Sequence, residues 1–177
     1  GGYGILLDVG SNVDCKPETL SQFAFLGSMY AERVLGIDTP KVGLINIGEE
    51  SEKGNAVAQA AFQLMKDADD YHFIGNIEGR DLFNDKADVM VCEGFTGNII
   101  LKLAESLYEI AQQQAVNNQY FDRFNFENYG GTPVLGVAKP VIIGHGISGA
   151  KAFMNMIYLA QQIIEKEVMK KMKEELS

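Results

Sequence analysis

The stretch that decides the fold is DVMVCEGFTGNIILKLAESLYEIAQQQ, residues 88–114. It opens with a short apolar run of strand length, passes through two closely spaced glycines, and continues with apolar residues at helical spacing. The apolar stripe of this helix consists of Ile99, Leu103, Leu107 and Ile110. A strand, a glycine turn and an amphipathic helix in this order form one unit of an α/β protein.

The rest of the chain repeats this alternation of strands and helices. Further strand-like runs lie at residues 4–9, 42–47, 71–77 and 140–143, and helical segments at 18–35, 55–66 and about 148–175. Residues 117–131 break both periodicities and are expected to form a loop or a short hairpin. The pattern predicts an α/β fold with a mostly parallel sheet and helices on both faces, in a single domain over residues 1–177.

Composition excludes several classes of partner. The formal net charge of −9 offers no positive surface for a nucleic acid or an anionic membrane. No apolar run reaches the length of a membrane span, so we expect a cytoplasmic protein. The two cysteines and two histidines have no metal-ligand spacing, so we expect no metal and no cofactor.

Ligands of α/β proteins collect at the carboxyl ends of the strands, so the turns after the strands are the candidate sites. The first of these turns, residues 8–14, reads DVGSNVD. Its Asp-x-Gly-x-Asn pattern resembles the phosphate loop of sugar-kinase and actin-like ATPases, but there a second strand follows, whereas here Pro17 and a helix follow. A tight turn in which Asp8 and Asn12 cap the next helix is an equally good interpretation.

The second turn, residues 48–55, carries Lys53 just before a helix. A lysine at a helix start opposes the helix dipole, and a bound anion beside it would remove that conflict. Alternatively, Lys53 pairs with one of the neighbouring glutamates, and these supply the favourable negative charge.

The third turn, residues 93–98, offers backbone N–H groups around Gly94 and Gly97 that suit a phosphate or a developing oxyanion. The alternative is that Asn98 is simply the N-cap of the helix.

The fourth turn, residues 144–149, formally matches the Gly-x-Gly-x-x-Gly fingerprint of dinucleotide sites. That fingerprint requires a later strand that ends in an acidic residue, whereas this chain ends in helix, so we reject a nicotinamide site. His145, close to Ser148, remains a candidate contact for an anion or a leaving group. The alternative is a histidine whose hydrogen bonds are satisfied by backbone carbonyls.

The motifs together resemble one known family. LLDVGSNVD at residues 6–14 and GFTGN at 94–98 are similar to motifs of PlsX, the bacterial acyl-acyl-carrier-protein:phosphate acyltransferases of phospholipid synthesis. Further matches lie, in the same order, at residues 16–18, 42–48, 53–55, 73–81, 129–131 and 145–146. The order and the spacing agree along nearly the whole chain.

The resemblance implies a fold similar to phosphotransacetylases and isopropylmalate-type dehydrogenases, a homodimer, and transfer of a fatty acyl group from acyl-acyl carrier protein to inorganic phosphate. It also implies that roughly the N-terminal half of the family's chain is absent here. The catalytic lysine of the family falls on Lys53 and its catalytic asparagine on Asn98. The candidate substrate- and phosphate-binding residues are Asp8, Asn12, Asn55, Gly94, Thr96, Gly97, His145 and Ser148.

One departure from the family bears on membrane contact. The segment between Asn98 and Tyr129 is shorter than the helical hairpin that carries a membrane-touching tip in the family, so peripheral membrane contact is not expected. Two other functions stay open at this point. They are a phosphotransacetylase acting on acyl-coenzyme A and a non-catalytic nucleotide-binding or dimerisation fragment.

Overall fold

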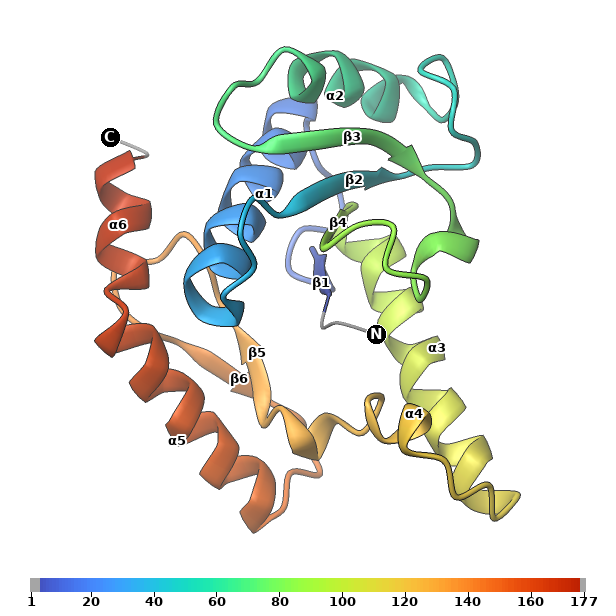
Figure 1. Ribbon diagram of the computed structural model, residues 1–177, viewed down its shortest axis with the longest axis vertical. Coiled ribbons are helices and arrows are strands. Elements are labelled where there is room, and N and C mark those ends of the chain that lie inside the picture. The colour runs from blue at the N-terminus through green and yellow to red at the C-terminus, as the bar shows by residue number, and fades with distance from the viewer. Residues whose placement is uncertain (1–3, 176–177) are drawn as a thin grey trace. The chain divides into compact units, whose positions relative to one another are not determined.

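The computed structural model describes residues 4–175 of the chain (Figure 1). The described residues divide into two compact units, with the boundary between Ile99 and Ile100 inside a continuous helix. The expectation of a single domain stays a prediction, because a boundary inside a helix does not decide whether the units fold separately.

The first unit contains a four-stranded parallel sheet in the order β1-β4-β2-β3. Its strands are β1 (Ile5–Leu7), β2 (Lys41–Ile45), β3 (His72–Ile77) and β4 (Val89–Val91). Helix α1 (Pro17–Tyr30) contacts β1, β2 and β4, and α2 (Ala56–Lys66) contacts β3 and α1. The predicted α/β class with a mostly parallel sheet is therefore confirmed.

The core of this unit lies between the sheet and α1 and α2. Strand residues Val42, Leu44 and Val89 are almost fully buried, together with Leu20 of α1 and Met65 of α2. Each such side chain contributes about 1.5–3 kcal/mol to stability through its removal from water. The central strands β2 and β4 are thereby held as fixed supports for the loops that follow them.

Helix α1 ends as the sequence indicates, with one local difference. A π-helical turn (Ala31–Leu35) continues it, and Gly36 closes it with a left-handed φ of 71°. Pro17 occupies the first turn, where its missing N–H costs no helical hydrogen bond.

The second unit contains the remaining elements. After α3 (Gly94–Gln113), which begins in the first unit, come α4 (Gln119–Asp122), a 3-10 turn (Phe126–Asn128), β5 (Gly131–Pro133), β6 (Ile142–Gly144), α5 (Ala150–Glu165) and α6 (Val168–Glu175). Strands β5 and β6 form a separate antiparallel sheet.

Two sequence predictions are wrong in this unit. The strand predicted at residues 140–143 does not join the parallel sheet, because β6 pairs antiparallel with β5. The last helix, predicted as continuous over residues 148–175, is broken at Glu167, whose φ of 51° is left-handed. No glycine or proline marks this break in the sequence, so periodicity alone could not reveal it.

Candidate functional site

Three of the predicted turns lie along one edge of the parallel sheet. Strands β1, β4 and β2 are neighbours and run in the same direction, so the loops that follow them emerge side by side. The segments after β1 and β2 are loops at residues 8–13 and 48–55, and the segment after β4, residues 93–98, passes into α3 at Gly94. The topology thus gathers the loops of Asp8, Asn98 and Lys53, which are distant in sequence.

The carboxylate of Asp8 organises the loop after β1. Its Oδ1 accepts the N–H of Ser11 at 3.1 Å, and its Oδ2 accepts the N–H of Asn12 at 2.6 Å and the side-chain amide of Asn12 at 3.0 Å. The Asp8 residue is buried, with 7% of its surface exposed. Both carboxylate oxygens are therefore engaged inside the loop, and the hydrogen bonds fix its path.

The loop after β1 interlocks with the start of α3. The Gly94 N–H donates to the Asn12 carbonyl at 2.7 Å, and the Asn98 Nδ2 lies 3.4 Å from the Val9 carbonyl oxygen. A Cβ at Gly97 would overlap the carbonyl oxygen of Asp8. The glycine here is required by backbone approach, and this close approach sets the position of the exposed Asn98.

Glu93 holds the first turn of α3. One of its carboxylate oxygens accepts the Thr96 N–H at 2.7 Å and the other accepts the Thr96 hydroxyl, while the Gly97 N–H donates to the Glu93 carbonyl at 3.1 Å. A carboxylate at this end of a helix is favoured by the helix dipole. The amides of Gly94, Thr96 and Gly97 thus have acceptors within the protein, and their predicted contacts with phosphate stay predictions.

Asn98 is not the N-cap of α3. The helix begins at Gly94, four residues earlier than the sequence pattern indicates, so Asn98 lies inside it. Among the described residues, the side chain of Asn98 makes only the long contact to the Val9 carbonyl, and such a distance marks a weak hydrogen bond.

The loop that carries Lys53 is held by two asparagines and a helix cap. The Asn46 side chain donates to the Lys53 carbonyl at 3.0 Å, and the Asn76 side chain donates to the Glu50 carbonyl at 2.8 Å. Asn55 caps α2, because its Oδ1 accepts the Ala58 N–H at 2.9 Å. Sequence reasoning assigned no role to Asn46 or Asn76, which lie on strands β2 and β3 or directly after them.

Lys53 itself is exposed and unpaired. No ion pair found among residues 4–175 includes it, which removes the interpretation that a neighbouring glutamate neutralises it. Glu49 of the same loop does form ion pairs. Its carboxylate lies 2.6 Å from the Lys86 ammonium and 3.9 Å from the Arg80 guanidinium. The positive charge of Lys53 is thus left for solvent or a ligand.

A buried carboxylate anchors the same loop. Asp81 accepts an ammonium hydrogen of Lys86 at 2.9 Å, and Lys86 also contacts Glu49 of the Lys53 loop. The pKa of Asp81 is lowered to about 2. The largest cause is the hydrogen bond from the Glu78 N–H, followed by those from Lys86 and Asn84. Glu49 raises the pKa of Lys86, with a further contribution from Asp81. Thirty-seven residues separate Lys86 from Glu49, and no local pattern in the sequence indicates the pairing.

Comparison with known proteins now bears on this arrangement. Residues 1–171 match the model of a family described as fatty acid synthesis protein. The chain belongs to this family. Among its relatives, the phosphate acyltransferase of Dictyoglomus thermophilum is 42% identical over 98% of the chain and 57% of the relative. That of Salinibacter ruber is 44% identical over 94% and 55%, and that of Aquifex aeolicus is 42% identical over 97% and 56%. The chain spans just over half the length of these relatives.

In this member of the fatty acid synthesis protein family, His145 and Ser148 lie in the second unit. The Ser148 N–H donates to the His145 carbonyl at 3.0 Å, so the two residues share one turn after β6. The His145 Nδ1 and the Ser148 Oγ are buried without a hydrogen-bond partner among the described residues. The interpretation of a histidine satisfied by backbone carbonyls is therefore wrong, because the only hydrogen-bond contact found for its ring is with a lysine.

Neither cysteine has the low thiol pKa that is typical of a nucleophile. Burial raises the pKa of the Cys92 thiol to about 12, and burial followed by the charge of Asp8 raises the pKa of Cys15. Cys92, directly after β4, is buried, whereas Cys15 is only partly buried.

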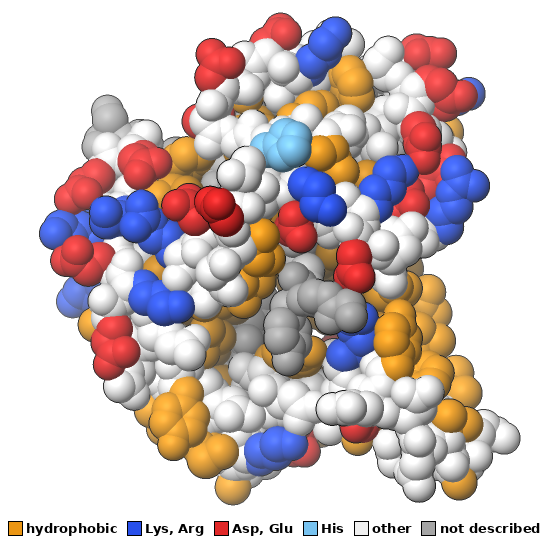
Figure 2. Space-filling model, in the orientation of Figure 1, with side chains coloured by type: hydrophobic (Ala, Val, Ile, Leu, Met, Phe, Trp, Pro, Cys, Tyr) orange, Lys and Arg blue, Asp and Glu red, His pale blue; other side chains and the backbone are white. Residues whose placement is uncertain are grey.

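Within residues 4–175, no three His, Cys, Asp or Glu side chains are grouped as metal ligands, and no helix is both long and apolar enough to cross a membrane. On the face shown in Figure 2, acidic and basic side chains are interspersed, in keeping with the net charge of −9.

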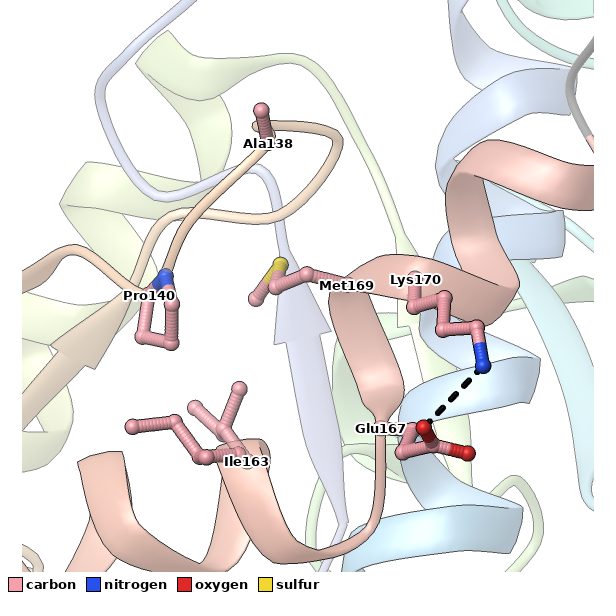
Figure 3. A pocket seen from close by; sticks show the side chains of 7 residues that line it. Ala138, Pro140, Ile163, Glu167, Met169 and Lys170 are labelled. Carbon is pink, nitrogen blue, oxygen red and sulfur yellow. Dashed lines mark hydrogen bonds and ion pairs between the residues drawn. The ribbon is translucent and has the colours of Figure 1, made fainter.

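A cavity of about 230 Å³ lies at the bend between α5 and α6. Apolar side chains such as Ile163 and Met169 line it, and Lys170 pairs with Glu167 at 3.1 Å (Figure 3). Because this ion pair neutralises the two charged groups of the lining, the cavity offers no reactive group.

Proposed function

We propose that this chain forms the phosphate- and thioester-binding part of a phosphate acyltransferase that moves a fatty acyl group from acyl-acyl carrier protein to inorganic phosphate. The observation that carries the proposal is that Lys53, which has no ion-pair partner among residues 4–175, lies on the loop after β2, while the exposed Asn98 lies near the start of the helix that follows the neighbouring strand β4. The relatives, which are phosphate acyltransferases, support the reaction class. The choice of carrier protein rests on the resemblance to the PlsX family.

Lys53 holds the phosphate in this proposal. Its loop is acidic, yet Glu49 is drawn toward Lys86 and Arg80, and Lys53 has no ion-pair partner among the described residues. An ammonium group binds phosphate oxygens as a point charge. Asn12 and Asn55 flank the same edge of the sheet and stay candidate phosphate contacts.

Asn98 stabilises the oxyanion. Its amide makes only a weak contact with the Val9 carbonyl, so its hydrogens remain available to an oxygen that gains charge in the transition state. One such donor is worth about 100- to 1,000-fold in turnover. Asp8, Gly94, Thr96 and Gly97 support this role by fixing the start of α3 against the loop after β1.

The chemistry needs no further group from the enzyme. A phosphate oxygen attacks the thioester carbonyl carbon, the carbonyl oxygen becomes the oxyanion, and collapse of the intermediate breaks the C–S bond. The products are acyl phosphate and a thiolate. A thiol has a pKa of about 8.5, so the thiolate leaves without strong acid assistance, and no covalent enzyme intermediate is required.

We also propose a homodimer. Large apolar side chains of α3 and α5 are exposed, and exposed apolar surface of this kind marks an interaction site. They include Leu103 at 62% exposure and Ile157 at 68%. The expected cytoplasmic location and the expected absence of a cofactor and of membrane contact stay predictions.

The test is an assay of acyl phosphate formation by the full-length protein with long-chain acyl-acyl carrier protein and phosphate. Lys53→Ala and Asn98→Ala should each abolish turnover while the urea unfolding curve stays unchanged. Lys66→Ala, an exposed lysine at the other end of α2, is the matched control and should keep full activity. Unchanged rates in both site variants would refute the proposal.

Two further arms separate the competing functions. A phosphotransacetylase would form acyl phosphate from acyl-coenzyme A at least as fast as from acyl-acyl carrier protein. A non-catalytic nucleotide-binding fragment would bind nucleotides more tightly than phosphate in calorimetry and would show no turnover with either thioester.

A further inference from the structure

A second group of charged side chains lies in the second unit. Lys102 and Glu105 occupy neighbouring turns of α3, and His145 follows β6. The Lys102 Nζ lies 3.3 Å from the His145 Nε2 and 2.9 Å from the Glu105 Oε2, and the same carboxylate oxygen lies 3.8 Å from the His145 Nε2. Two nitrogen groups therefore share one carboxylate.

The imidazole ring is held in one orientation. Phe126 stacks on it with the ring centroids 4.6 Å apart and the planes 26° from parallel. The 3-10 turn that carries Phe126 is tied to α5, because the Asn155 side chain donates to the Glu127 carbonyl at 2.8 Å. The Nε2 of His145 is thereby aimed at the Lys102 ammonium.

Neither neutral form of His145 satisfies every hydrogen bond in this arrangement. If Nε2 accepts a hydrogen from Lys102, the ring proton lies on Nδ1, which is buried without an acceptor. If Nε2 carries the proton, it faces the ammonium, and at 3.8 Å the Glu105 oxygen is too far to accept it. One added oxyanion that accepts from both the Nε2–H and the Nζ would remove the unfavourable contact between the Nε2–H and the ammonium.

We propose that Lys102 and His145 form a binding site for a phosphate group. When no phosphate is bound, the Glu105 carboxylate lies at this site, and it therefore competes with phosphate for binding. Solvent reaches Lys102 and His145, since their side chains are 52% and 33% exposed, whereas Glu105 is 19% exposed. The phosphate group comes from inorganic phosphate or from the phosphodiester of a carrier protein's prosthetic arm. Only this choice of ligand rests on the proposed function.

The proposed competition by Glu105 leads to a prediction that would not hold if Lys102 were an ordinary surface lysine. Lys102→Met should weaken phosphate binding at least tenfold, because the charge at the centre of the site is lost. Glu105→Gln should strengthen binding several-fold, because the competing charge is lost while the shape of the side chain is kept. Lys102→Arg should retain binding, since it keeps the charge.

The chain has only two histidines, so ring resonances in NMR report on the site directly. Inorganic phosphate, phosphopantetheine and chloride at equal ionic strength are titrated into the full chain. The His145 ring signals should shift and saturate with at least one of the two phosphate probes and not with chloride. His72, at the exposed start of β3, serves as the internal control and should not move.

Lys151→Met is the matched control variant, because Lys151 lies in the same unit and is bonded to Asn128 instead. It should leave the titration unchanged. Saturation by inorganic phosphate alone, or by phosphopantetheine as well, identifies the source of the phosphate group. Equal shifts of both histidines, or a Glu105→Gln variant that binds no more tightly than the unmodified chain, would overturn the assignment. Lys53→Ala tests the proposed function separately, because it should leave the His145 titration intact.

Discussion

Replacing Gly97 by alanine tests whether the backbone contact between the first turn of α3 and the loop after β1 fixes the candidate site. A Cβ at this position would overlap the Asp8 carbonyl oxygen and would lie 2.9 Å from the Asp8 carbonyl carbon and 3.0 Å from the Cys92 sulfur. Two backbone hydrogen bonds oppose a movement of Asp8 that would relieve this overlap. The Asp8 N–H donates to the Cys92 carbonyl at 2.9 Å, and the Cys92 N–H donates to the Leu7 carbonyl at 2.8 Å.

The size of the effect follows from this geometry. Forcing a methyl group into a packed site costs about 1–3 kcal/mol, and here the clash is with backbone, which cannot rotate away. We therefore expect a loss of about 3 kcal/mol in the free energy of unfolding. For a chain of this size that corresponds to a fall in Tm of roughly 6–12 °C. Because Asn98 follows directly, kcat/KM of the full-length protein should fall as well.

The assay is urea unfolding of the chain, followed by circular dichroism, with Gly79→Ala as the matched control. A Cβ at Gly79 would meet nothing within 4 Å, and its φ is not left-handed, so that substitution should change stability by less than about 0.5 kcal/mol. If Gly97→Ala proves as stable as Gly79→Ala, the loop after β1 does not lie against α3 as described.

Three further predictions concern the supports of the site. Asp8→Asn should cost about 2 kcal/mol in urea unfolding, because an amide cannot accept all three hydrogen bonds of the carboxylate; an unchanged curve would contradict its organising role. The Asp81 pKa, about 2 when folded, lies below the unfolded value of about 3.9, so its stabilisation is present above pH 4 and lost as the pH falls toward 2. The stability difference between the unmodified chain and Asp81→Asn should therefore shrink from pH 5 to pH 2, whereas a constant difference would exclude this linkage. Lys86→Met should release Glu49 and weaken phosphate binding by Lys53 in calorimetry, while Lys66→Met should not.

The sequence carries the fold class because the fold class depends on local patterns, whereas the candidate site stays a prediction. Short apolar runs and the proline in the first turn of α1 each determine structure over a few residues, and the strands of the parallel sheet and α1 lie close to where they are predicted. The edge shared by the loops of Lys53 and Asn98 follows from the parallel pairing of neighbouring strands, which was expected from the alternation of strands and helices.

What the sequence could not reveal depends on contacts between distant residues. Nothing near Glu49 indicates that Lys86 will draw it away from Lys53, and nothing near His145 indicates that Lys102 and Phe126 will surround it. The sequence pattern does not indicate that α3 starts at Gly94. The helix starts there because Glu93 accepts the Thr96 N–H, and a single glutamate in a sequence does not show that it makes such a hydrogen bond. Likewise, three-residue strands such as β6 contain too few side chains to show which partner they pair with.

A double-mutant cycle on Lys53 and Asn98 tests the central claim most directly, with kcat/KM for acyl phosphate formation measured in the full-length protein carrying Lys53→Ala, Asn98→Ala and both. If the two side chains act on one bound phosphate and thioester, their effects couple, and the double variant loses at least about 1 kcal/mol less than the sum of the single losses. Losses that add to within about 0.5 kcal/mol would mean that the two residues act independently, and would contradict a shared site.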